Sequence, residues 1–309
     1  MRFVNPCNPF ACFSVLRLKS SIMKSIITLL LALGLCVSFA QNKNQDFHLN
    51  KEYKMEPKGT LTLSCSDAKV FITGSSRKTA QVKIDREVNT KGLVFGESEF
   101  RIDVDDSNGN LEIKEHSNST NVGIVGYHYE KYTIKIELPE GASLKINGDD
   151  GDYFVKSVNG SMDIQLDDGD LELTACKGNQ FRFRMDDGDI KMDEGRGTLE
   201  LDADDADVEI LKGNFSSINA DLDDGDFIIQ TSLTDNGNYF IDSQDGSVVM
   251  TILGGGGKFD VRHDDGHVST QGNFSIVEKS EDRTRLTLAN GNAKVDIRAD
   301  DARVRLAAN

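Results

Sequence analysis

The sequence contains a tetrapeptide of the type Asp-Asp-Gly-Asp that returns at a nearly constant interval. Its second residue falls at eight positions, which are Asp150, Asp168, Asp187, Asp205, Asp224, Asp245, Asp265 and Asp301. The intervals are 18, 19, 18, 19, 21, 20 and 36 residues, and the last one corresponds to two units with a degenerate middle unit near Glu281 and Asp282. A period of about 18–20 residues with two short strands per unit is typical of a stacked β architecture.

Apolar and polar residues alternate on both sides of each tetrapeptide. Met162, Ile164 and Leu166 precede one tetrapeptide, and Leu171 and Leu173 follow it. This period of two gives each strand one dry face and one wet face, and two such faces close over a core only if successive units stack. The sequence therefore predicts an all-β fold, a parallel β-solenoid with about 18–20 residues per coil.

The outward positions support the same register. In the predicted stack, Arg182 falls between Asp163 and Glu200, and Arg184 falls between Gln165 and Asp202, as favourable cross-strand pairing requires. An antiparallel meander or β-sandwich remains the alternative, because Asp-Gly between alternating strands is also a strong hairpin signal. Alanine replaces the glycine at three corners (Ala68, Ala206 and Ala302), where a hairpin turn that needs positive φ would be strained.

Residues 1–40 form a predicted leader that does not belong to the fold. Met23 and Lys24 open a signal-peptide pattern, an apolar run follows, and Ala40 is the expected last residue of a signal peptide over residues 23–40. A lipoprotein cleavage at Cys36 fits less well, because Leu35 is bulky. The apolar run is too short to span a membrane. We therefore expect an exported protein located in the periplasm, at the cell surface or outside the cell.

The rest of the chain divides into three predicted parts. Residues 41–58 form a linker, residues 59–143 an irregular β region, and residues 144–309 the regular repeats. Residues 115–129 interrupt the pattern and are interpreted as a loop or insertion, rich in aromatic residues and glycine, that is the best candidate for specific binding. In the final unit, Arg298, Arg303 and Arg305 are interpreted as protection of an exposed sheet edge.

Charge and cysteine content narrow the classes of partner. The leader removes four basic and no acidic residues from totals of 35 and 51, so the remaining chain carries a net charge of −20. This negative charge argues against nucleic acid and anionic membranes as partners. It is compatible with binding of cations or of basic partners, or it only keeps the protein soluble. Two cysteines remain, Cys65 and Cys176, and because they lie several repeats apart we expect two free, buried or half-buried thiols rather than a disulfide.

The stacked corners predict a column of carboxylates. Calcium takes six to eight oxygen ligands, and two adjacent corners offer six aspartates as candidate calcium ligands: Asp167, Asp168, Asp170, Asp186, Asp187 and Asp189. The alternative is that aspartate and glycine simply suit tight turns and that the carboxylates face water. The fourth acid is replaced at Ser247, His267 and Arg303, so a continuous metal ladder cannot run the full length.

A catalytic site is not indicated. Polysaccharide lyases and hydrolases on β-solenoids use acidic clusters, but acid–base catalysis needs carboxylates with unequal surroundings, and here the acids are the repeat itself. His263, on the inward register beside Asp264 and Asp265, is interpreted as structural. We expect no catalytic residues and no cofactor apart from possible calcium.

The repeats, the early segment SDAKVFITG and the segment TIKIELPEGASLKI at residues 133–146 resemble an exported bacterial family of β-helical domains of unknown function named “putative adhesin”. The resemblance implies a right-handed parallel β-solenoid, export and a role at the cell surface, and offers no catalytic residues. The expected function is a non-enzymatic, adhesin-like module that binds a protein or a glycan. The alternatives are a calcium-stabilised structural rod and a polysaccharide lyase or hydrolase.

Overall fold

The computed structural model describes residues 46–264, 267–289 and 291–308, except for the side chains of residues 93–98 and 118–122. The predicted leader and Cys36 lie outside the described residues. The described residues belong to one compact unit, Asn44–Asn309, and their regular structure is strand apart from a short 3₁₀ turn, η1 (Ser107–Gly109). The strands are β1 (Phe47–Lys54), β2 (Thr60–Cys65), β3 (Lys69–Ser75), β4 (Thr79–Asp105), β5 (Leu111–Pro139), β6 (Ser143–Asp150), β7 (Tyr153–Lys156), β8 (Met162–Asp168), β9 (Leu171–Thr174), β10 (Gln180–Met192), β11 (Gly195–Asp224), β12 (Asp226–Ser232), β13 (Asn238–Ser243), β14 (Ser247–Gly254), β15 (Gly257–His263), β16 (Val268–Gln271), β17 (Phe274–Lys279), β18 (Arg283–Leu288), β19 (Ala293–Ala299) and β20 (Arg303–Ala308).

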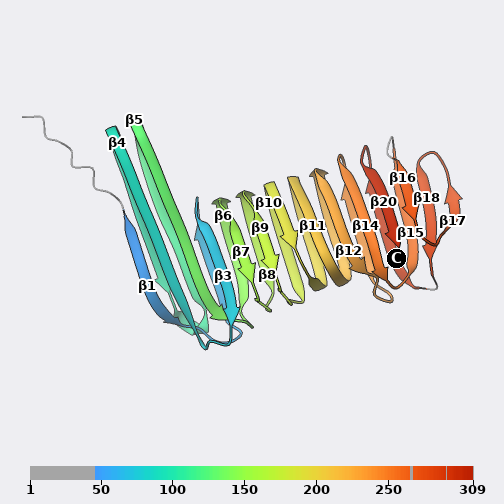
Figure 1. Ribbon diagram of the computed structural model, residues 1–309, viewed down its shortest axis with the longest axis horizontal. Coiled ribbons are helices and arrows are strands. Elements are labelled where there is room, and N and C mark those ends of the chain that lie inside the picture. The colour runs from blue at the N-terminus through green and yellow to red at the C-terminus, as the bar shows by residue number, and fades with distance from the viewer. Residues whose placement is uncertain (1–45, 265–266, 290, 309) are drawn as a thin grey trace, which may run out of the picture. The chain divides into compact units, whose positions relative to one another are not determined.

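Successive repeats lie over one another as parallel rungs (Figure 1). Each rung contributes one strand before the acidic corner, which we call the first wall, and one strand after it, the second wall. The corner residues Asp150, Asp168, Asp187 and Asp205 are register partners in turn. The prediction of a parallel β-solenoid is therefore confirmed, and the antiparallel alternative is wrong for the stacked rungs.

The core lies between the two walls. Inward side chains of both walls are almost fully buried, among them Ile164 and Leu166 on the first wall and Leu171 and Leu173 on the second. The predicted outward columns are also present, because Arg182 contacts Glu200 at 2.8 Å and Arg184 lies 3.9 Å from Asp202. At the end of the second wall, where β16 pairs with β20, Val268 is buried and Thr270, two residues further along the same strand, is exposed.

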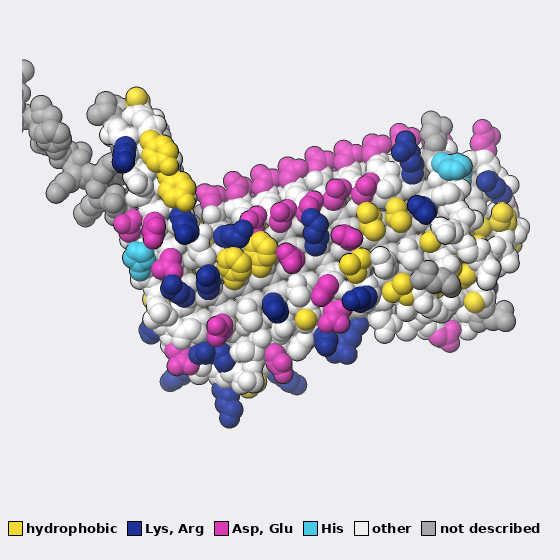
Figure 2. Space-filling model, viewed as in Figure 1, with side chains coloured by type: hydrophobic (Ala, Val, Ile, Leu, Met, Phe, Trp, Pro, Cys, Tyr) yellow, Lys and Arg dark blue, Asp and Glu magenta, His cyan; other side chains and the backbone are white. Residues whose placement is uncertain are grey.

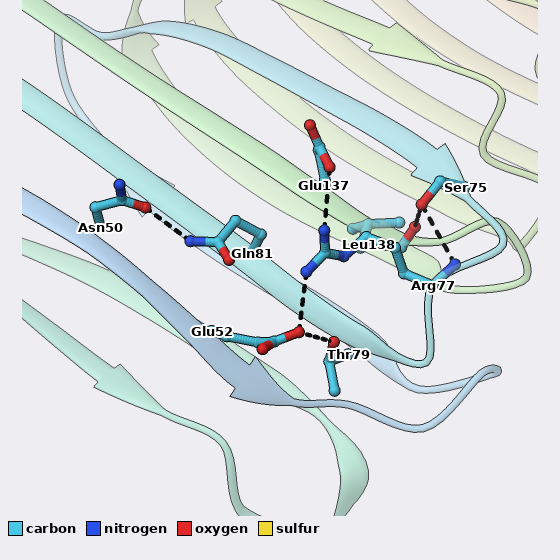
Figure 3. Close-up of polar contacts among 8 residues, drawn as sticks. All are labelled: Asn50, Glu52, Ser75, Arg77, Thr79, Gln81, Glu137 and Leu138. Atoms are coloured by element: carbon cyan, nitrogen blue, oxygen red, sulfur yellow. Dashed lines mark hydrogen bonds and ion pairs between the residues drawn. The ribbon is translucent and has the colours of Figure 1, made fainter.

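The N-terminal end of the stack is covered by antiparallel strands. β5 contributes a rung of its own, since residues 111–114 pair with β2 and residues 133–139 pair with β3. β4 pairs with β5 along its length, and β1 pairs with β4. Figure 3 shows Arg77 joining these layers through Glu52 of β1 (2.9 Å) and Glu137 of β5 (3.4 Å), beside a Gln81–Asn50 hydrogen bond of 2.7 Å.

The C-terminal end differs from the prediction. The segment near Glu281, predicted to be a degenerate repeat unit, is instead an antiparallel hairpin of β17 and β18 that pairs with β15. The last rung, β19 and β20, lies inside the stack, between β13/β14 on one side and β15/β16 on the other. The interpretation of Arg298, Arg303 and Arg305 as edge protection is therefore wrong, because their strands are paired on both sides.

Candidate functional site

The first two acids of each regular corner form one continuous feature. We call it the acidic ridge, and its members are all exposed: Asp149, Asp150, Asp167, Asp168, Asp186, Asp187, Asp204, Asp205, Asp223 and Asp224. Figure 2 shows acidic side chains in a row along the upper edge of the stack. The row exists because each corner repeats the same backbone path, so equivalent carboxylates lie about 4.8 Å apart, the spacing of neighbouring strands.

Repulsion along the ridge changes its acidity. The pKa of Asp168 is raised by partial desolvation and by the negative charges of Asp187 and Asp150. The pKa values of Asp204 and Asp224 are raised for the same reasons, with Asp186 and Asp245 as the respective first neighbours. The three shifts have the same direction, and each is caused first by desolvation and then by the charges of neighbouring aspartates.

The fourth acid of each corner has a different task. The carboxylate of Asp170 accepts a hydrogen bond from the backbone N–H of Asp189 at 3.3 Å, and that of Asp207 accepts one from Asp226 at 2.8 Å. Asp189 in turn contacts the ammonium of Lys191 at 2.6 Å. Asp170 and Asp207 therefore join one rung to the next, whereas the Asp189–Lys191 contact lies within a single strand.

The six predicted calcium ligands thus fall into two columns. Asp167, Asp168, Asp186 and Asp187 belong to the acidic ridge, while Asp170 and Asp189 take part in the ladder between rungs. Within the described ranges, no three His, Cys, Asp or Glu side chains are grouped so as to hold a metal ion. Calcium binding by these residues stays a prediction.

Residues 115–132 stand where residues 65–68 connect β2 to β3, so the predicted insertion is an expanded corner. It is not a loop, because β5 continues through it and pairs with β4. The two strands run past the ends of β6 to β9 (Figure 1). Gly92 and Gly126 lie opposite each other with φ of +132° and +149°, a conformation that strongly favours glycine.

The protruding part of β4 and β5, which we call the hairpin arm (residues 86–95 and 123–132), presents apolar side chains to solvent. Val125, Tyr127 and Tyr129 alternate along β5, so they share one face, and they are 65%, 57% and 49% exposed. Across from them in β4, Lys91 faces Tyr127 and Asn89 faces Tyr129. Figure 2 shows these hydrophobic side chains gathered at the end of the acidic row.

The base of the hairpin arm is held by a half-buried ion pair. Arg86 donates two hydrogen bonds to Glu130, at 2.5 and 3.0 Å, and its guanidinium lies 4.1 Å from the ring centre of Phe100. Phe100 packs edge-on against Tyr132 at 5.5 Å. Sequence reasoning missed this anchor, because its partners are distant in the chain and belong to no repeat.

Two further predictions concern single side chains. Cys65 and Cys176 are free and buried, as predicted. Burial raises the pKa of Cys65 to about 12 and that of Cys176 to about 11, and Cys65 lies 3.3 Å from the Tyr153 hydroxyl. His263 is half-buried and its Nε2 lies 3.4 Å from the hydroxyl of Thr284, in keeping with a structural position.

The family model that matches this chain is that of Toastrack DUF4097, and it covers residues 59–306. The chain belongs to the Toastrack family. This Toastrack chain is also similar to three solved structures: a “putative cell adhesion protein” from Clostridium sporogenes (14% identity, 85% of this chain and 100% of that chain, TM-score 0.26), a “putative adhesin” from Bacteroides fragilis (12%, 84% and 97%, 0.38) and a “putative lipid binding protein” from Parabacteroides distasonis (11%, 85% and 98%, 0.28).

These TM-scores are too low to carry an argument about ligands of the Toastrack chain. No curated protein matches it. Across the described residues, no helix of this Toastrack protein is long and apolar enough to cross a membrane. Family membership therefore supports the β-solenoid and the resemblance drawn from the repeats, while function depends on the surface itself.

Proposed function

We propose that the chain is an exported, non-enzymatic binding module of adhesin-like type, and that the hairpin arm contacts its ligand, a protein or a glycan at a surface. The observation that carries the proposal is the exposed row of Val125, Tyr127 and Tyr129 on an expanded corner that departs from the repeat. Tyrosine is enriched at binding surfaces because a rigid ring buries much area and its hydroxyl keeps a hydrogen-bond partner.

The surroundings of Val125, Tyr127 and Tyr129 indicate a role in ligand binding rather than in the stability of the fold. Every described side chain of residues 123–129 is exposed, so the row packs against no part of its own stack. The regular corners make the same connection with four residues, three aspartates and a glycine or alanine. An expanded corner with apolar side chains therefore has no evident structural need, whereas a ligand would bury it.

A paired mutation tests the proposal. The Tyr127→Ser/Tyr129→Ser variant should lose ligands that the unaltered chain retains on a glycan array and on a panel of surface proteins, with an unchanged thermal midpoint. The matched control is Leu253→Ser/Ile276→Ser, since these apolar residues are 38% and 63% exposed on β14 and β17, and it should keep the ligands. Equal binding by the unaltered chain and the tyrosine variant would contradict the proposal.

A calcium-stabilised rod is the second candidate, and the raised pKa values of Asp168, Asp204 and Asp224 favour it. They result from desolvation and, after it, from repulsion between neighbouring aspartates, and a divalent cation would relieve that repulsion. Thermal unfolding with millimolar calcium and with chelator tests it, because a cation bound only by the folded state raises the midpoint. An identical midpoint in both solutions would exclude the calcium rod.

A polysaccharide lyase or hydrolase is the least supported alternative. Catalysis by two carboxylates requires one to be kept protonated and the other ionised. The acidic ridge repeats the same exposed aspartates at each regular corner and sets no pair of carboxylates apart, which supports binding instead. Turnover of an acidic polysaccharide that disappears on changing one aspartate would reverse this judgement.

A further inference from the structure

The outer face of β15, β18 and β19 carries a cluster of basic side chains that contrasts with the acidity of the chain. We call it the basic groove, and its members are Lys258, Arg262, Arg283, Arg285, Lys294 and Arg298. The registers bring them together, because Lys258 lies beside Lys294, Arg262 beside Arg298, and Arg262 opposite Arg283. The three strands contribute only Asp260 and Asp296 as acids to the same face.

The groove is concave and partly prearranged. A depression of about 560 Å³ is lined by four basic side chains, by two acids and by apolar residues, among them Lys258, Arg283, Arg285, Lys294, Asp260, Asp296 and Val277. Arg283 is held by Asp260, with Nε at 2.7 Å from Oδ1, and Arg285 is held by Glu278 at 3.0 Å. Two guanidinium groups are thus fixed in position before any ligand arrives.

Part of the positive charge of the groove is not neutralised. Lys258 and Lys294 are neighbours on adjacent rungs, and neither has an acidic partner within 4 Å among the described residues. The Nε of Arg285 is shielded from solvent and has no hydrogen-bond partner in the described part of the chain. Adjacent like charges destabilise a sheet, so folding alone does not explain a lysine pair here.

We propose that the basic groove binds an acidic oligosaccharide through its carboxylate or sulfate groups. The planar guanidinium groups of arginine and the ammonium groups of lysine are the hydrogen-bond donors that recognise such anions. The basic positions span about 13 Å along the strands and about 4.8 Å between rungs, a grid that suits a ligand with regularly repeated charges. A site of this volume admits a short segment of a chain-like ligand.

Other polyanions fit the groove less well. β15 is paired on both sides, so the floor offers no free edge to which an acidic peptide could add as a strand. A long nucleic acid would extend past the groove and meet the repulsion of a chain with an excess of acidic residues. The proposal is independent of the hairpin arm and stands if the arm binds nothing.

The test measures the binding of defined probes to the full chain by microscale thermophoresis. Oligogalacturonate represents carboxylates and sulfated dextran represents sulfates, while neutral dextran and polyglutamate represent uncharged glycans and acidic peptides. We expect oligogalacturonate or sulfated dextran to bind and neutral dextran not to bind. The affinity for the acidic glycan should fall steeply between roughly 50 and 200 mM salt. The Lys258→Gln/Lys294→Gln variant should bind roughly tenfold or more weakly, as expected from the loss of charge-assisted hydrogen bonds.

Lys114→Gln/Lys145→Gln is the matched control, because both lysines are exposed on the first wall far along the stack. It should bind like the unaltered chain, and Lys258→Arg/Lys294→Arg should retain binding. Equal affinity of the glutamine variant and the unaltered chain would overturn the proposal. So would tighter binding of polyglutamate than of either acidic glycan, or salt-sensitive self-association that the glutamine variant abolishes, since a peptide or a second copy would then be the occupant.

Discussion

The third position of the corner accommodates two backbone conformations, and positive φ occurs there only with glycine. Gly169 and Gly188 have φ of +139° and +121°, and a Cβ on either would meet a backbone oxygen of the preceding rung within about 2 Å. Ala206, at the equivalent position, is not among the residues with positive φ, and its methyl group is buried. The corner therefore tolerates alanine only where the methyl group can enter the core.

This difference predicts the effect of a single methyl group. Gly169→Ala should lower the free energy of unfolding by about 2–5 kcal/mol, because strain at positive φ adds to a clash with the oxygen of Gly151. Gly123→Ala is the control, since its Cβ would meet nothing within 4 Å, and it should be neutral. Urea unfolding measures both, and a neutral result at Gly169 would contradict the corner geometry.

The acidic ridge predicts a dependence on pH. Because the pKa of Asp168 is raised in the folded state, the folded chain binds more protons than the unfolded chain, and stability falls as pH rises from about 4 upward. Asp168→Asn should therefore raise the thermal midpoint at neutral pH and low salt, and the gain should vanish below pH 4.

Salt and a neighbouring aspartate provide the controls for this prediction. High salt should reduce the gain, because it screens exposed charges. Asp170→Asn should lower the midpoint instead, since the Asp170 carboxylate accepts the backbone N–H of Asp189. If both asparagine variants shifted the midpoint equally, the two columns of acids would not differ as described.

At the scale of elements, the hairpin arm is the part of the described chain that depends least on the stack. A two-stranded ribbon is only marginally stable in water. The packed contacts at its base therefore decide whether it is ordered, and Arg86, 8% exposed, lies at their centre.

Arg86→Ala should loosen the hairpin arm without unfolding the stack. We expect a loss of about 2–4 kcal/mol locally, because the variant removes both hydrogen bonds of a half-buried pair and leaves Glu130 uncompensated. Hydrogen exchange should rise in residues 86–95 and 123–132 and stay unchanged in β8 to β12. Arg101→Ala, which removes an exposed ion pair with Asp103, should leave hydrogen exchange unchanged both in the hairpin arm and in β8 to β12.

At the scale of the molecule, the order of rungs in space departs from the order in the chain at both ends. β5 lies outside β2 and β3 although it follows them in the sequence, and β19/β20 lies between β13/β14 and β15/β16. The antiparallel strands β1, β4, β17 and β18 cover the ends. Stacked repeats need such caps, because a bare end would expose both core and strand edges.

Removal of residues 291–309 tests this order. The truncation deletes an interior rung, so β15 and β16 should lose their parallel partners β19 and β20. The hairpin of β17 and β18 is paired to β15, so β15 to β18 should become disordered together. Limited proteolysis should then remove residues 257–289 while residues 46–250 resist. Continued protection of residues 257–289 would show that the C-terminal hairpin is anchored in another way.

The regular repeats could be predicted from the sequence because their pattern is local. Alternation places Ile164 and Leu166 inward and Asp163 and Gln165 outward, and a constant period then leaves one register that keeps every inward set in the core. The absence of a disulfide between Cys65 and Cys176 followed from the same period, because stacking separates them by several rungs. The acidic ridge was equally predictable, since repeated corners must stack when the rungs stack.

The ends, the hairpin arm and the basic groove were not predictable in this way. Residues 115–129 are polar and irregular, and they are strands only because β4 pairs with them. Lys258 and Lys294 meet only because the last rung is inserted beside β15, so no spacing in the sequence brings them together.

The amino-acid sequence by itself determined the cross-section of this protein, because period-two alternation and a constant repeat specify which side chains enter the core of each rung. The tertiary structure alone decided the order of the terminal rungs, the caps and the surfaces available for binding. Those features depend on pairing between segments far apart in the chain, and pairing of that kind leaves no local pattern of residues.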